Sequence, residues 1–112
     1  MICLDGLSLS LDDVARVARE GWKVQLDEEA VKRAEASEAA VREWENSDDP
    51  VYGINTGFGD LASVSISRKD RRQLQENLIK SHACGMGAPF PEDITRAMLL
   101  LRTNSLIRGH SG

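Results

Sequence analysis

Residues 51–59 read Val51-Tyr52-Gly53-Ile54-Asn55-Thr56-Gly57-Phe58-Gly59, with three glycines within seven residues. Glycine adopts positive φ angles without steric cost, so this spacing predicts a loop and not a regular helix or strand. Loops carry binding and catalytic side chains more often than helices do. Because this loop presents a tyrosine, an asparagine and a threonine, it is the first candidate for a functional segment.

Two nucleotide-binding motifs offer alternative interpretations of this loop. It is not a Walker phosphate loop, because no Gly-Lys-Ser/Thr follows it. Gly57-Phe58-Gly59-Asp60-Leu61-Ala62 fits a loose G-x-G-x-x-A pattern, but that pattern needs a preceding strand and a helix that opens inside it. Here Ser63-Val64-Ser65-Ile66 follows, which alternates like a strand or an extended arm. On composition alone, a plain connecting loop is the remaining alternative.

Length and composition limit the class of protein to which this chain can belong. A chain of 112 residues forms one domain at most, and 41% hydrophobic with 29% charged residues is ordinary for a globular protein. The net charge of −4 gives no support for a nucleic-acid partner. The sequence has neither a membrane-spanning apolar run nor a signal-peptide pattern at its N-terminus. Cys3 and Cys84 show no metal-ligand spacing and no disulfide framework, so we expect a cytosolic chain with reduced thiols.

The first 26 residues predict a small hairpin and one helix. Asp5-Gly6 separates the apolar runs 2–4 and 7–9, which is a turn signal for a β-hairpin. Ser10 and Asp13 are spaced as a capping box, so a helix is expected to begin at Ser10 and to end at Gly21. Residues 23–26 alternate and are expected to pair with the hairpin.

Three further helices are expected. Acidic residues 27–29 open a helix that runs to about Asn46, and its thin apolar stripe is typical of a surface scaffold helix. Ser67-Arg68-Lys69-Asp70 predicts another capping box, after which Leu74, Leu78 and His82 share one face. A lone histidine on such a face is usually a core or interface residue.

The last helix is expected to begin near Pro91 and is apolar on most sides. Its apolar residues are Ile94, Ala97, Met98, Leu99, Leu100, Leu101, Leu106 and Ile107. A helix of this kind is buried inside a larger body than 112 residues can provide. Arg102, Asn104 and Arg108 would then need polar partners from outside the chain.

From Val51 onward the chain resembles the aromatic amino acid ammonia-lyases, and among them the histidine branch. The matching segments are residues 51–59, Leu61-Ala62-Ser63, Leu74-Gln75-Glu76-Asn77-Leu78, residues 81–87 and residues 96–112, whereas residues 1–50 resemble the family loosely. The resemblance implies a mainly α fold with a small N-terminal β-hairpin, as the N-terminal segment of the fumarase/aspartase-like helical fold. The expected organisation is 1–50 hairpin and scaffold helices, 51–66 tyrosine loop and arm, and 67–112 two helices.

The resemblance also implies a reaction, the loss of ammonia from an α-amino acid. Family members are several times longer and use 4-methylideneimidazol-5-one, an electrophile made from their own Ala-Ser-Gly. This chain contains no Ala-Ser-Gly, so we expect it to be catalytically inert by itself. Tyr52 matches the family's catalytic tyrosine. A free phenol has a pKa near 10, so a tyrosine that acts as a base near neutral pH needs a site that favours its phenolate.

His82 matches the position that faces the substrate ring, where a hydrogen-bonding residue argues against phenylalanine. With Ala83-Cys84-Gly85 it favours the histidine branch, hence L-histidine as substrate and trans-urocanate as product in histidine degradation. Asn55 and the Gly59 amide are candidate substrate contacts or loop-shaping groups. The resemblance implies a cytoplasmic homotetramer, and the charge, the lack of a long apolar run and the cysteine spacing predict no nucleic-acid, membrane or metal partner. The alternatives are a tyrosine ammonia-lyase or aminomutase, or a truncated non-catalytic interaction module.

Overall fold

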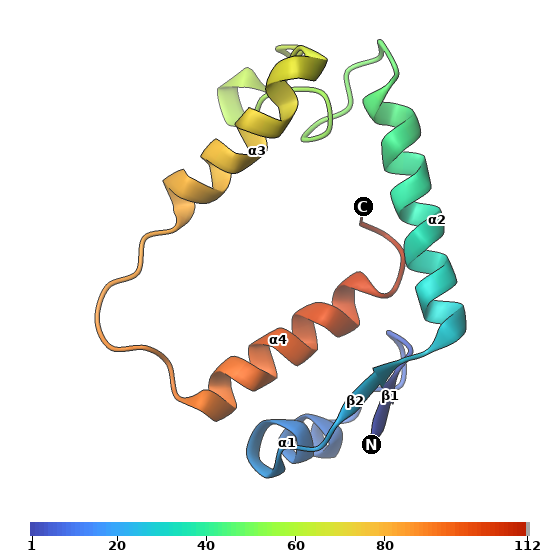
Figure 1. Cartoon of the computed structure of the whole chain (residues 1–112), viewed down its shortest axis with the longest axis vertical. Coiled ribbons are helices and arrows are strands. Elements are labelled where there is room, and N and C mark those ends of the chain that lie inside the picture. Colours follow the sequence, from blue (N-terminus) through green and yellow to red (C-terminus); the bar gives the residue numbers. More distant parts are fainter. Residues whose placement is uncertain (112) are drawn as a thin grey trace. The chain divides into compact units, whose positions relative to one another are not determined.

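The computed structural model of the protein describes residues 1–111 and consists mainly of helices (Figure 1). Its elements are β1 (Ile2–Leu4), α1 (Leu11–Glu20), β2 (Val24–Leu26), α2 (Glu28–Glu45), the 3₁₀ turn η1 (Gly59–Leu61), α3 (Arg68–His82) and α4 (Glu92–Leu106). The mainly α fold with a small sheet is therefore confirmed, and so are the helices expected at 27–46, after Ser67 and after Pro91.

The predicted N-terminal β-hairpin is wrong. β1 pairs with β2 in parallel, with Ile2 opposite Val24 and Leu4 opposite Leu26. The Asp5 carboxylate instead accepts hydrogen bonds from the Leu7 and Ser8 amides, at 2.7 and 2.8 Å, so the turn leads the chain away from β1. Parallel strands need a crossover connection, and α1 supplies it. The expectation that residues 23–26 belong to the same sheet is confirmed.

Local sequence signals determine both ends of α1. Ser10 Oγ accepts a hydrogen bond from the Asp13 amide at 3.2 Å, and the Ser10 amide donates to Asp13 Oδ2 at 3.1 Å, which confirms the capping box. Gly21 ends the helix with a φ of 69°, in the left-handed region that glycine adopts most easily. The helix therefore begins and ends where the sequence predicts.

The Asp5 turn should make stability depend on pH in the acid range. Hydrogen bonds from the backbone amides of Leu7 and Ser8 lower the pKa of Asp5 to about 2, from an ordinary value of 3.8. Because the folded pKa lies below the unfolded pKa, the carboxylate stabilises the fold above about pH 4, and this stabilisation is lost as the pH falls through about 2. Asp5→Asn keeps an acceptor oxygen but does not titrate, so its unfolding temperature should fall less steeply between those pH values.

The control for this pH measurement is Asp12→Asn, at the start of α1. The Asp12 side chain makes no hydrogen bond to the other residues of the described segment 1–111. Its substitution should leave the steepness of the acid decline unchanged. If Asp5→Asn declines as steeply as the unsubstituted protein, the Asp5 turn does not contribute to acid stability.

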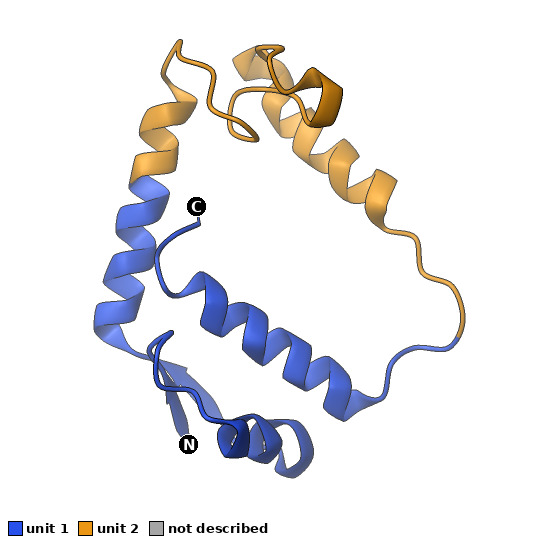
Figure 2. Cartoon of the chain, turned by 180° about the vertical axis from the view of Figure 1, so that it is seen from behind, with its two compact units in different colours: residues 1–39, 88–112 blue, residues 40–87 orange. Residues whose placement is uncertain are grey.

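The chain divides into two compact units (Figure 2). Unit 1 combines Met1–Ala39 with Ala88–Gly112, and unit 2 is the continuous segment Ala40–Gly87. In unit 1, α1 packs against α4, and Leu4, Val17 and Leu100 form a buried cluster. The two helices within residues 67–112 thus belong to different units, because α4 joins the N-terminal elements.

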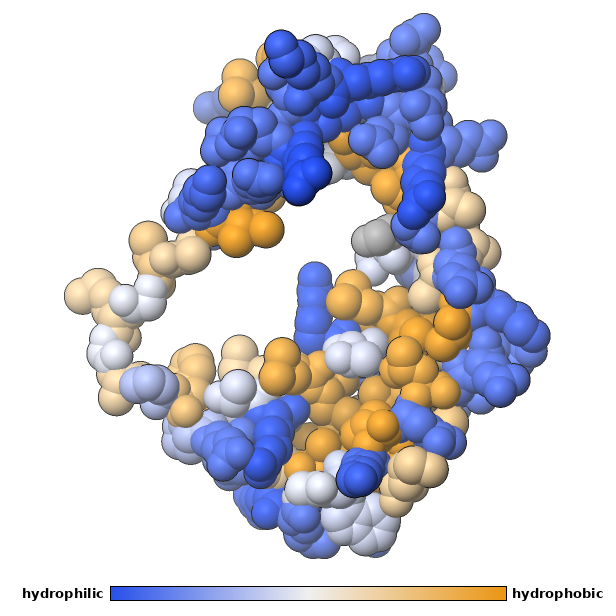
Figure 3. All heavy atoms as spheres, viewed as in Figure 1, coloured by the Kyte–Doolittle hydropathy of each residue, from blue (hydrophilic) through white to orange (hydrophobic). Residues whose placement is uncertain are grey.

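Only part of the apolar surface of α4 is buried within unit 1. Leu100 is buried, whereas Met98 and Leu99 are 55% and 65% exposed. An apolar groove of about 330 Å³ is lined by Leu4, Val17, Val24, Gln25, Leu26, Arg96, Leu99, Leu100 and Thr103. Figure 3 shows hydrophobic residues gathered over α4 and the strands. Asn104 Oδ1 is buried without a hydrogen-bond partner among the described residues, as expected for a helix that lacks its full surroundings.

None of the helices formed by residues 1–111 is both long enough and apolar enough to cross a membrane.

Candidate functional site

The tyrosine loop, residues 51–66, is folded back on itself in unit 2. The Gly57 amide donates to the Val64 carbonyl at 3.0 Å, and the Ile66 amide donates to the Asn55 carbonyl at 2.9 Å. Thr56 and Ser65 form an isolated antiparallel bridge, whereas the residues between Gly59 and Val64 form η1, a turn and a bend. The segment is an irregular loop, as its glycines predict, and only Ser65 has the strand-like pairing expected of an arm.

Asn55 lies at the centre of the loop with 2% of its surface exposed. Its Oδ1 accepts a hydrogen bond from the Val51 amide at 2.8 Å. Its Nδ2 lies 2.8 Å from the Asp49 carbonyl oxygen and 3.3 Å from those of Trp44 and Ser47. Both the oxygen and the nitrogen of the side-chain amide are therefore hydrogen-bonded to backbone groups. The side chain anchors the loop to the end of α2.

Two arginines of α3 also bind backbone carbonyl groups around the end of α2. Arg68 donates to the Asn46 carbonyl at 3.0 Å. Arg71 donates to the Ile66 carbonyl at 3.0 Å and to the Glu45 carbonyl. Cationic side chains are favourable at a helix C-terminus, where carbonyl groups lack partners within the helix. These contacts join α2, the tyrosine loop and α3 within unit 2.

The predicted capping box at the start of α3 is wrong in its details. Ser67 is the residue that precedes the helix, but its hydroxyl does not accept a backbone hydrogen bond. The hydroxyl instead donates to Asp70 Oδ2 at 2.6 Å. This hydrogen bond to a charged acceptor still links Ser67 to the first turn of α3.

Tyr52 stands on this anchored loop and is 63% exposed. Its ring meets Phe58 edge-on, with 5.9 Å between the ring centroids and 79° between the ring planes. The next residue, Gly53, donates its amide hydrogen to Thr56 Oγ1 at 3.2 Å, and its carbonyl oxygen lies 3.4 Å from Gln75 Nε2 of α3. The Tyr52 ring is therefore accessible, and the backbone next to it is held by hydrogen bonds to Thr56 and Gln75.

Gly57 is required by close packing and not by a special backbone angle, since its φ is not positive. A Cβ atom at this position would lie 2.6 Å from the Cβ of Leu61 and 2.8 Å from the Leu61 carbonyl oxygen. Both distances are shorter than van der Waals contact. We therefore expect Gly57→Ala to lower the free energy of unfolding by about 1–3 kcal/mol, as overpacking does elsewhere. Urea unfolding of the full-length protein measures this change.

Gly85→Ala is the matched control for this substitution. No atom lies within 4 Å of a Cβ built at Gly85, and its φ is also not positive. Its stability should stay within about 0.5 kcal/mol of the unsubstituted protein. Equal effects at the two glycines would contradict the packing argument.

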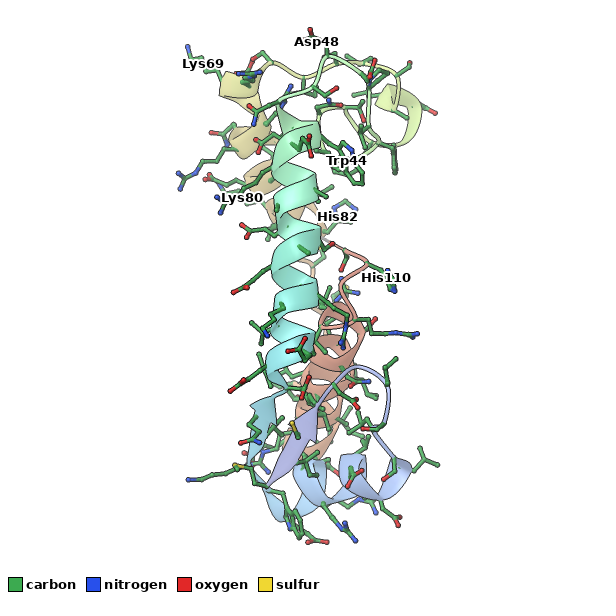
Figure 4. All side chains as sticks on the ribbon, turned by 90° about the vertical axis from the view of Figure 1, so that its right-hand side faces the viewer. Trp44, Asp48, Lys69, Lys80, His82 and His110 are labelled. Atoms are coloured by element: carbon green, nitrogen blue, oxygen red, sulfur yellow. The ribbon has the colours of Figure 1, made fainter. Side chains whose placement is uncertain are left out.

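His82 is the last residue of α3 and is exposed (Figure 4). Its Nδ1 lies 2.9 Å from the Leu78 carbonyl oxygen and 3.0 Å from Ser81 Oγ. Gln75 and His82 are two helical turns apart, so they lie on the same face of α3, about 10 Å apart along its axis. Leu74 and Leu78, on the face expected to include His82, are half-buried.

The structure thus brings Tyr52, Asn55 and Gly59 together in one loop and connects that loop to the helix of His82 through Gln75. Gly59 begins η1 with a φ of 58° and is exposed. Substrate contacts by Asn55, Gly59 and His82 stay predictions. Within residues 1–111, no group of three His, Cys, Asp or Glu side chains is placed to hold a metal ion.

Sequence reasoning missed Arg71, Gln75 and Phe58. Arg71 and Gln75 bind backbone carbonyls of segments distant in sequence, and Phe58 faces the tyrosine ring. Their residue types are ordinary for a helix surface and for an aromatic in a loop. Phe58 carried a usable signal, because it lies in the same short loop as Tyr52 and paired aromatic rings attract each other.

Comparison with known proteins assigns the chain to a family. The family model described as aromatic amino acid lyase matches residues 9–112. The histidine ammonia-lyase of Streptococcus gordonii is 52% identical over the whole chain, which spans 22% of that enzyme. A crystal structure of histidine ammonia-lyase from Trypanosoma cruzi superposes with a TM-score of 0.86 at 38% identity, over 96% of this chain and 21% of that one. Tyrosine aminomutase from Streptomyces globisporus gives 0.89 at 32% identity, over 96% and 20%.

The chain spans about a fifth of the length of the curated relatives that it matches. Within that fifth, each structural comparison covers 96% of the chain, so nearly all of its backbone is shared with these solved structures. A family model that matches nearly the whole chain, together with relatives that are about half identical to it, leaves no other assignment. The chain belongs to the aromatic amino acid lyase family.

Proposed function

We propose that this chain is the N-terminal part of a histidine ammonia-lyase, which converts L-histidine into trans-urocanate and ammonia. The observation that carries the proposal is the 52% identity with a histidine ammonia-lyase over all 112 residues. The exposed imidazole of His82, on the same helix that binds the tyrosine loop, agrees with a site for a polar aromatic ring.

Tyr52 is the proposed general base of this reaction. In the elimination, a Cβ–H bond and the Cα–N bond of the substrate break, the electron pair forms the Cα=Cβ double bond, and ammonia leaves. Tyr52 offers a phenol oxygen on a loop that Asn55 and Gln75 hold in place. Positioning of this kind favours proton transfer. Two roles stay open for this base: it takes the Cβ proton, or it first deprotonates the substrate amine.

The family's electrophile does not come from these residues. Where present, 4-methylideneimidazol-5-one turns the substrate amine into a leaving group. Its Ala-Ser-Gly precursor is absent from the 112 residues, and Ser111-Gly112 is preceded by His110. None of its chemistry is therefore assigned to this segment. We propose that another part of the enzyme supplies the group and that this segment supplies Tyr52 and His82.

His82 is the proposed specificity residue, because a polar group at the substrate ring discriminates strongly between ligands that satisfy it and ligands that do not. The tyrosine branch is the second candidate, since histidine also suits a phenol. The identity of 32% with a tyrosine aminomutase favours it less than the 52% with a histidine enzyme. The similar TM-scores of the two branches do not discriminate, because the backbone is common to both.

The face of α4 supports the view that this segment is completed by further structure. Leu99 and Met98 are exposed, and Asn104 Oδ1 has no partner within the described segment. The family's remaining chain would cover such a surface. Assembly as a cytoplasmic homotetramer is part of the same proposal and rests on the resemblance alone.

The test is a substrate profile of the full-length protein that contains these residues. Purified enzyme is incubated with L-histidine, L-tyrosine or L-phenylalanine, and ammonia and the unsaturated acid are both measured. Urocanate from L-histidine supports the proposal, and coumarate from L-tyrosine supports the second candidate. No product from any of them supports a non-catalytic interaction module. The isolated 112-residue chain serves as the inactive control, and ammonia release above its Tyr52→Phe variant would contradict that expectation.

A further inference from the structure

We propose that the Leu78 carbonyl and the Ser81 hydroxyl hold His82 in the tautomer that is protonated at Nδ1, so that Nε2 is presented as a hydrogen-bond acceptor. Ser81 is then a positioning residue for recognition of the substrate ring. This inference deepens the proposed function and rests on it, because the substrate ring is the group that Nε2 would meet.

The tautomer follows from the two groups around Nδ1. The Leu78 carbonyl oxygen, 2.9 Å from Nδ1, can only accept a hydrogen bond, so Nδ1 must be the donor. Ser81 Oγ donates to the same carbonyl oxygen at 2.9 Å, and its lone pair faces the Nδ1–H at 3.0 Å. In the other tautomer, the Nδ1 lone pair would point at the carbonyl lone pairs, which is repulsive.

The consequence concerns the other ring nitrogen. A neutral imidazole has one donor and one acceptor nitrogen, and the hydrogen bond at one nitrogen determines the role of the other. With Nδ1 protonated, Nε2 accepts a hydrogen bond and does not donate one. A substrate ring that carries an N–H or O–H group satisfies Nε2. A phenyl ring leaves it unpaired, which costs binding free energy.

The position of His82 makes this orientation possible. It is the last residue of α3, so the preceding turn of the helix supplies both the Leu78 carbonyl and the Ser81 side chain. The three groups therefore lie within one turn of a single helix, and their geometry does not depend on any other segment. Ser81 is exposed, so its hydroxyl is not needed to fill a core.

The first arm of the test reads the tautomer directly, by magic-angle-spinning NMR of the full-length protein labelled with ring-¹⁵N histidine. A difference spectrum against His82→Gln assigns the His82 signals. The expected result is a protonated Nδ1 and an unprotonated Nε2. A protonated Nε2 would overturn the inference. Because this arm needs no activity, it remains decisive even if the proposed reaction is absent.

The second arm measures kinetics of Ser81→Ala, with Ser81→Thr as the conservative variant. Loss of one neutral hydrogen bond should raise KM for L-histidine about three- to tenfold and leave kcat nearly unchanged. Ser81→Thr keeps a hydroxyl and should restore KM. The inhibition constant of L-phenylalanine, which has no ring donor, should not change. An equal loss for both ligands, or a loss in kcat alone, would overturn the positioning role.

Discussion

Replacement of Tyr52 by phenylalanine is expected to lower kcat of the full-length enzyme for L-histidine by about 10²–10⁴-fold, the usual contribution of a general base. The substitution removes only the phenolic oxygen. The ring and its edge-on contact with Phe58 are retained, so the loop should keep its conformation. KM should change little, because the role proposed for the oxygen is in the chemical step. Ammonia release and urocanate formation measure the change.

Stability provides the control for Tyr52→Phe. Tyr52 is 63% exposed, and its phenol makes no hydrogen bond to the described residues. The unfolding temperature should therefore remain within about 1–2 °C of the unsubstituted enzyme, as for other exposed substitutions. A variant that keeps more than about a tenth of the activity would contradict the assignment of the base, since even a modest general base contributes about 10²-fold.

Asn55→Ala is expected to have the largest effect on stability, a loss of about 2–4 kcal/mol. The substitution removes a side chain that is 2% exposed, together with its hydrogen bonds to the Val51 amide and to the carbonyl groups of Trp44, Ser47 and Asp49, and each hydrogen bond contributes about 0.5–1.5 kcal/mol. Activity should fall as well, because Tyr52 lies in the released loop. Urea unfolding measures stability, and limited proteolysis between residues 47 and 66 reports whether the loop has opened.

Two further variants make the Asn55 prediction sharper. Asn55→Asp has the same shape and can still accept from the Val51 amide, but its carboxylate faces carbonyl oxygens to which Nδ2 donates. It should be at least as destabilising as Asn55→Ala. Asn46→Ala removes one exposed hydrogen bond to the Arg42 carbonyl and should cost less than about 1 kcal/mol. Equal, small effects at positions 46 and 55 would show that Asn55 is not an anchor.

Helices whose first and last residues are determined by neighbouring residues could be predicted from the sequence. The capping box of Ser10 and Asp13, the glycine at position 21 and the proline before α4 each act on neighbouring residues, so pattern and structure agree. The partner of β1 could not be predicted in this way. Asp5-Gly6 indicates a turn in either case, and the choice of a parallel partner depends on the packing of α1 against α4.

In the candidate site, too, features set by neighbouring residues could be predicted and features set by distant residues could not. Tyr52, Asn55 and His82 are recognisable from their places in a motif, but the function of Asn55 as a fastener depends on carbonyl groups of residues 44–49, which no local pattern reveals. Arg71 is a similar case, because its partners at Glu45 and Ile66 belong to other segments. A motif therefore identifies the proposed substrate contacts more readily than it identifies the residues that hold them in place.

The interleaving of the two units has a consequence for synthesis on the ribosome. Unit 2 is one continuous stretch, Ala40–Gly87, so all of its internal partners are available once that stretch has emerged. Unit 1 is split, and the cluster of Leu4 and Val17 stays open to solvent until Leu100 has been made. Domains generally fold as units during translation. The segment with Tyr52 can therefore fold first. The nascent N-terminal segment exposes its apolar residues, and can bind chaperones, until α4 has been synthesised.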